Sequence, residues 1–125
     1  MNFKIIDAGI MDGFETLVKI GGYIILFSIL TFALNRSPLP EALKFLLGCT
    51  LEVTNGIHLI AASSLPLQTK YILAMAVVAF GGLSGIAQTS SMIKDTSLSM
   101  KKYCKVKLFL TLCSLILAIF AARLL

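Results

Sequence analysis

The sequence is poor in charge, in cysteine and in the side chains that soluble enzymes use for chemistry. Charged residues make up 14% of the 125 residues, and there are three cysteines, three prolines, one histidine and no tryptophan. An average soluble domain carries about 25% charged residues. Hydrophobic residues reach 58% and the mean hydropathy is +0.94, more apolar surface than a body this small can bury. The composition excludes a water-soluble globule and predicts a single-domain integral membrane protein.

The scarcity of reactive side chains argues against several function classes. An odd number of cysteines cannot complete a disulfide framework, and Cys49 and Cys113 lie in apolar stretches where a thiol acts as a small hydrophobe. Cys104 is expected to be a reduced thiol, with palmitoylation as the alternative. One histidine, His58, and the lack of metal, nucleophile or phosphate-loop motifs predict no enzyme, metal site or cofactor. The +5 charge is not interleaved with aromatics, so we expect no nucleic-acid partner.

Apolar runs divide the chain into helical segments. The predicted segments are an amphipathic stretch at 1–17, spans at 18–34, 71–93 and 107–124, and a less regular segment at 41–66. The first stretch is typical either of an interfacial helix or of the first turns of the next helix. Lys107 and Arg123 are expected to reach from the ends of the last span to the membrane surface.

The segment 41–66 is apolar at both ends and polar in the middle. Each arm is about half as long as the ~20 residues that a membrane-spanning helix needs. Between the arms lie Glu52, Asn55 and Gly56. The segment is either one spanning helix with these residues at its centre or a re-entrant hairpin, whose tip must be covered by protein or by a water-filled cavity. We favour the hairpin.

Three glycines interrupt the span at 71–93. Gly81, Gly82 and Gly85 each cost about 1 kcal/mol relative to Ala inside a helix, which predicts an unwound or kinked segment. Ser84 lies among them, and the half that follows is more polar than the half before. The alternative is close packing of a neighbouring helix against small residues.

Lysines concentrate in the connector at 94–107. They are Lys94, Lys101, Lys102, Lys105 and Lys107, against Asp95 alone. By the positive-inside rule this connector should be cytoplasmic. With a hairpin at 41–66 the chain would cross the membrane three times, with its N-terminus inside and its C-terminus outside. A spanning segment at 41–66 would instead put both termini on the same side.

Glu52 is the candidate site residue that the energetics single out. An acidic side chain near mid-membrane costs about 2.5–3.5 kcal/mol unless it is paired, hydrated or protonated. Its neighbours Thr50, Thr54 and Asn55 offer hydroxyl and amide groups to a polar solute or a cation. Free backbone groups and Ser84 at the glycine break would add to such a site. The alternative is a shallower hairpin that leaves Glu52 at the membrane surface.

Two stretches resemble a known family. Residues 51–56 (Leu-Glu-Val-Thr-Asn-Gly) and 80–88 (Phe-Gly-Gly-Leu-Ser-Gly-Ile-Ala-Gln) are similar to the C-terminal half of the YlbJ family of sporulation integral membrane proteins. That family belongs to the nucleoside-recognition, or Gate, group of membrane domains, also found in ferrous-iron transporters and distantly similar to concentrative nucleoside transporters. The likeness covers roughly residues 15–125.

The resemblance implies an all-α polytopic membrane protein with the order span, hairpin, glycine-broken span, span. In the similar transporters, hairpin tips and unwound helices hold the substrate. The ligand-binding residues implied here are Thr50, Glu52, Thr54, Asn55, Ser84 and Gln88, with backbone breaks at Gly56, Gly81, Gly82 and Gly85. The implied role is solute translocation or recognition in a bacterial cell membrane, linked to sporulation. A structural or interaction protein of the membrane is the alternative.

The length of the chain implies partners. YlbJ-like chains carry two halves of this kind, whereas these 125 residues correspond to one. One repeat is not expected to enclose a site or to cover a hairpin tip by itself. Besides the lipid bilayer and a small polar solute, we therefore expect a second copy, a separately encoded Gate-domain half or the remainder of a larger chain.

Overall fold

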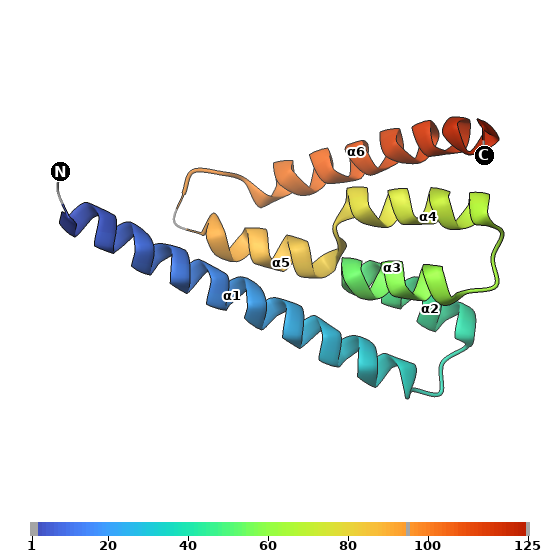
Figure 1. Cartoon of the computed structure of the whole chain (residues 1–125), viewed down its shortest axis with the longest axis horizontal. Coiled ribbons are helices and arrows are strands. Elements are labelled where there is room, and N and C mark those ends of the chain that lie inside the picture. Colours follow the sequence, from blue (N-terminus) through green and yellow to red (C-terminus); the bar gives the residue numbers. More distant parts are fainter. Residues whose placement is uncertain (1–2, 95, 125) are drawn as a thin grey trace.

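The computed structural model describes residues 3–94 and 96–124, and the described part is helical throughout (Figure 1). The helices are α1 (Phe3–Asn35), α2 (Glu41–Leu51), α3 (Val53–Ala62), α4 (Leu67–Phe80), α5 (Gly82–Met92), α6 (Met100–Ala121) and a short 3-10 helix, η1 (Ala122–Leu124). Three stretches are long and apolar enough to cross a membrane: Phe3–Asn35, Leu67–Met92 and Met100–Leu124. The shorter apolar helix α3 accompanies them. This confirms the predicted all-α class with three spans.

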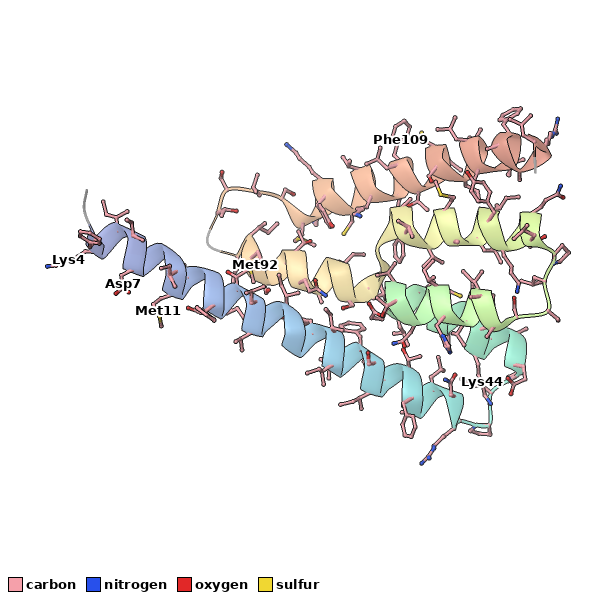
Figure 2. The ribbon with its side chains drawn as sticks, in the orientation of Figure 1. Lys4, Asp7, Met11, Lys44, Met92 and Phe109 are labelled. Atoms are coloured by element: carbon pink, nitrogen blue, oxygen red, sulfur yellow. The ribbon has the colours of Figure 1, made fainter. Side chains whose placement is uncertain are left out.

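The first span is one continuous helix. Its 33 residues extend about 50 Å, well beyond the ~30 Å hydrocarbon layer. Residues 3–17 are therefore the first turns of α1, and Figure 2 shows Lys4 and Asp7 at its far end, beyond the other helices. Glu15 pairs with Lys19 at 2.6 Å further along the helix. The excess length lets Lys4 and Asp7 lie outside the hydrocarbon layer.

Helices α2 and α3 form an antiparallel hairpin. Glu52 separates them with extended backbone (φ −145°, ψ 132°). The two helices approach closely at Gly56, where a Cβ would lie 3.0 Å from the Cα of Cys49. In Figure 1 the turns that precede and follow the hairpin lie at the same end of the bundle as the C-terminus. The segment thus enters and leaves at one end, and the 11 residues of α2 take its tip about 16 Å inward, half the thickness of the hydrocarbon layer.

The second span is broken at a glycine pair. Gly81 (φ +76°) and Gly82 (φ +69°) have left-handed backbone, and the Gly81 N–H ends α4 by donating to the Val77 carbonyl at 2.9 Å. The break is shorter than the sequence predicted, because Gly85 lies inside α5. Gly56, expected to be a second break, lies inside α3, where its missing side chain permits close packing. The 14 residues of α4 put the break about 21 Å along the span.

The third span begins earlier than predicted. Helix α6 starts at Met100, where the Ser99 hydroxyl accepts the Lys102 N–H. It packs lengthwise on α4 (Figure 1) and leaves large apolar side chains on its outer face, among them Phe109, which is 65% exposed (Figure 2). Such side chains suit contact with lipid acyl chains.

The break makes a testable demand for glycine. In a Gly82→Ala variant the alanine would have to adopt a left-handed φ, and its Cβ would press on the backbone of the hairpin tip. We expect a loss of about 1–3 kcal/mol, measured as a lower melting temperature of the detergent-purified protein. Gly85→Ala is the matched control: a Cβ there meets nothing within 4 Å and the residue is helical, so this variant should be as stable as the parent or more so. Equal melting temperatures for both variants would contradict the observed break.

Candidate functional site at the hairpin tip and the glycine break

The hairpin tip lies directly against the glycine break. A Cβ on Gly82 would come within 3.1 Å of the Leu51 carbonyl oxygen, 3.2 Å of the Glu52 Cα and 3.2 Å of the Val53 nitrogen. The main chains can approach so closely because Gly82 has no side chain. The two interrupted segments that the sequence singled out, 51–56 and 81–85, therefore meet at Gly82.

Glu52 is buried at the tip, with 2% of its surface exposed. Its carboxylate accepts the backbone N–H of Asn55 at 2.9 Å and the hydroxyl hydrogen of Thr54. Glu52 thus caps the first turn of α3, where a negative charge is favoured by the positive end of the helix. Both hydrogen-bond donors, the Thr54 hydroxyl and the Asn55 backbone N–H, belong to the same hairpin as Glu52. The carboxylate charge is therefore stabilised within one chain.

Two other predicted residues of the hairpin point in different directions. The Asn55 side-chain amide donates to the Ser28 hydroxyl at 3.3 Å and ties α3 to α1. Thr54 is exposed, and so is His58, which follows one turn later on the same face of α3. We call Thr54 and His58 the polar stripe of α3.

Ser84 and Gln88 form a pair within α5. Ser84 has 1% of its surface exposed, and the Gln88 amide donates to its hydroxyl at 2.9 Å. Helix α5 packs against α1 and α2. The buried polar residues Glu52 and Ser84 consequently lie in the region where these helices meet the hairpin tip.

Thr50 does not join these residues. Its hydroxyl donates to the Leu47 carbonyl of its own helix at 2.9 Å. Its side chain lines a cavity of about 240 Å³ together with apolar residues of α2, α3 and α4 and with Thr111 of α6. Glu52 and Ser84 are not among the residues that line this cavity. Thr50 therefore belongs to an apolar environment and is separate from the Glu52 carboxylate.

Lys107 contacts the break from the opposite side, which the sequence reasoning missed. Its ammonium donates to the Ala79 carbonyl at 3.2 Å, and a Cβ on Gly81 would lie 3.2 Å from the same nitrogen. The sequence predicts that Lys107 reaches toward the membrane surface, whereas the structure places its ammonium on the Ala79 carbonyl. Because α6 begins at Met100, Lys107 lies two turns inside the helix and faces α4. Its place at the edge of a lysine-rich connector concealed this role.

Charged side chains compensate the partial charges at the ends of two half-helices. The Glu52 carboxylate lies at the positive end of α3, and the Lys107 ammonium at the negative end of α4. Gly82, the first residue of α5, lies against the Leu51 carbonyl that ends α2. Within residues 3–94 and 96–124, every buried side-chain nitrogen and oxygen has a hydrogen-bond partner. The cluster is closed and internally satisfied in this conformation.

This burial corrects one expectation about the lone chain. We expected a single repeat to leave its hairpin tip uncovered, yet Glu52 and Ser84 are almost completely buried by the chain's own helices. The reason is the glycine pair, which lets the tip pack against the second span.

In the part of the chain that the structure describes, His, Cys, Asp and Glu side chains form no group of three that could hold a metal ion.

Comparison with known proteins gives one distant relative. The chain is 25% identical over 118 residues to the sporulation integral membrane protein YlbJ of Bacillus subtilis (strain 168), an alignment that covers 80% of this chain and 29% of the relative. The chain thus spans less than a third of that protein's length. No family model and no solved structure matches. The chain is accordingly a membrane protein distantly related to YlbJ.

The Lys107 contact predicts a stability difference between two neighbouring lysines. Lys107→Met removes the cation from the end of α4 and should lower stability by about 1–3 kcal/mol, because the Ala79 carbonyl loses a charged donor. Lys105→Met removes an equal charge from an exposed position of the same helix and should change little. Thermal unfolding of both variants in one detergent measures the difference. Equal melting temperatures would show that Lys107 makes no such contact.

Proposed function

We propose that this chain is one half of a transporter or receptor for small polar solutes, working with a second copy or a complementary half. The observation that carries the proposal is that the tip of the α2–α3 hairpin and the glycine break between α4 and α5 meet about halfway along the length of the bundle. Broken helices at this depth are typical of membrane transporters, in which half-helix ends and free backbone groups bind substrate. The distant likeness to YlbJ is compatible with this assignment.

The cost of the interruptions supports a functional reading. Backbone that leaves the helix within the hydrocarbon layer must find its hydrogen bonds in protein or water, and two continuous helices would avoid the problem. This chain retains both an acidic tip residue, Glu52, and a glycine pair with left-handed backbone. A charged side chain at this depth is a functional candidate by default.

The polar stripe of α3 supports a partner. Thr54 and His58 are exposed on the hairpin, which extends from one end of the bundle to about its middle. In contact with acyl chains the Thr54 hydroxyl would keep its bond to Glu52, but the His58 imidazole would lose the hydrogen bonds that water supplies. A second copy or a complementary half that packs beside the hairpin would enclose a water-filled space facing this stripe. Opening of the closed cluster would then expose Glu52, Asn55 and Ser84 to that space.

A second candidate function is a structural or interaction role in the membrane. The observation that favours it is the internal satisfaction of Glu52 by Thr54 and Asn55, which suffices to stabilise the hairpin without any solute. Under this alternative the polar stripe would pack dry against another protein. Water access to the stripe distinguishes the two functions.

Cysteine labelling measures that access. In a background with Cys49, Cys104 and Cys113 replaced by alanine, we expect His58→Cys to react with a charged, membrane-impermeant thiosulfonate in native membranes. Leu46→Cys is the matched control, since Leu46 is 59% exposed on the same hairpin but belongs to its apolar surface. Labelling of residue 58 at least tenfold faster than of residue 46 supports a water-filled space. Equal and slow labelling of both would favour the structural alternative.

The proposed orientation places the lysine-rich segment 94–107 in the cytoplasm. Figure 1 shows the end of α5 and the start of α6 at the same end of the bundle as the start of α1, opposite the hairpin turns. With Cys49 and Cys113 replaced by alanine, Cys104 should be protected from an impermeant maleimide in intact cells and labelled after permeabilisation. Ser64→Cys in a cysteine-free chain, at the opposite end between α3 and α4, should show the reverse. Labelling of Cys104 in intact cells would invert the orientation.

A further inference from the structure

A second cavity lies between α5 and α6, at the end of the bundle that holds their connector. Its volume is about 360 Å³. Ile93, Leu98 and Val106 form an apolar wall, and Ser99, Lys102 and Tyr103 form a polar rim. None of these residues takes part in the cluster at the hairpin tip. The cavity is therefore a feature that the proposed solute site does not use.

The rim of this cavity is ordered by hydrogen bonds. The Thr89 hydroxyl of α5 donates to the Gly85 carbonyl at 2.9 Å and accepts the hydroxyl hydrogen of Tyr103 of α6 at 3.2 Å, which joins the two helices beside the cavity. The Ser99 hydroxyl accepts the backbone N–H of Lys102 at 3.5 Å and caps α6. Lys102 is exposed in this first turn. A hydroxyl and a cation thus flank one apolar hollow.

Charge and shape together define the kind of occupant. Lys94, Lys101 and Lys105 add positive charge around Lys102, against a single acidic residue in the sequence 94–107. The apolar wall is open, with Leu98 66% and Val106 55% exposed. About 33 Å of helix separates Lys102 from Leu124, close to the thickness of the hydrocarbon layer, so Lys102 lies at headgroup level. An occupant with an anionic head and apolar chains matches all three features.

We propose that this cavity binds one anionic phospholipid. Its phosphate would lie against Lys102 and the Ser99 hydroxyl, and its acyl chains would run past Val106, one turn deeper along α6, toward the bilayer interior. Basic pockets between membrane helices bind anionic headgroups in this manner. The site is independent of the proposed solute pathway and of any partner chain.

Native mass spectrometry of the detergent-purified full chain tests the site. Phosphatidylglycerol and phosphatidylcholine of equal chain length are titrated separately against the parent, Lys102→Gln, Lys105→Gln and Val106→Trp. Lys105→Gln is the matched charge control, because Lys105 lies on the same helix and does not line the cavity. Val106→Trp fills the cavity without changing charge. Melting temperatures of all variants establish that each is folded.

A specific site predicts one bound phosphatidylglycerol in preference to phosphatidylcholine. Lys102→Gln and Val106→Trp should each weaken its binding roughly tenfold, whereas Lys105→Gln should weaken it less than about threefold. Equal losses in Lys102→Gln and Lys105→Gln would show diffuse attraction to a basic segment and overturn the proposal. Unchanged binding in Val106→Trp, or no preference for the anionic lipid, would overturn it as well.

Discussion

The chain leaves the helix at the hairpin tip, at Glu52, and at the glycine break, at Gly81, both well inside the bundle. A bilayer supplies no water there, and the rest of the structure depends on how these two interruptions are satisfied. The chain brings them together: Gly82 packs against the backbone of the hairpin tip, and Glu52 caps α3 from inside the contact. Lys107 supplies a cation to the end of α4 on the other side. Each break is thus covered by the chain itself, through oppositely charged helix ends.

This arrangement gives the small chain an unusual division of surfaces. The outer faces of α1 and α6 are apolar and suit lipid, while the interior holds buried polar residues, Glu52 and Ser84. The polar stripe of α3 is neither an apolar outer face nor a buried polar group, since it is polar and exposed on the hairpin. The proposed partner and solute pathway follow from that mismatch. The basic end of α6 belongs to a separate surface, where the proposed lipid site lies.

Much of the fold was predictable because its signals are local. Apolar runs, charge and glycine interruptions located the spans and the hairpin, and the energetic cost of a buried acid singled out Glu52. Tertiary contacts were not predictable in this way. Lys107 looked like a membrane-edge residue because the start of α6 at Met100 leaves little trace among the lysines. Thr50 neighbours Glu52 in sequence, yet the turn at the tip directs it to an apolar cavity, while Gly56 and Gly85 lie within helices.

The central claim is that the hairpin tip and the glycine break meet at mid-membrane beside a space that a partner completes. An oriented cryo-electron microscopy structure of the assembly in lipid nanodiscs, with a bound antibody fragment to add mass, tests it most directly. The account predicts residues 51–53 against residues 81–82 in the central third of the bilayer, with Thr54 and His58 facing water beside a second protein chain. A hairpin lying at the membrane surface, or a polar stripe covered by acyl chains, would contradict it.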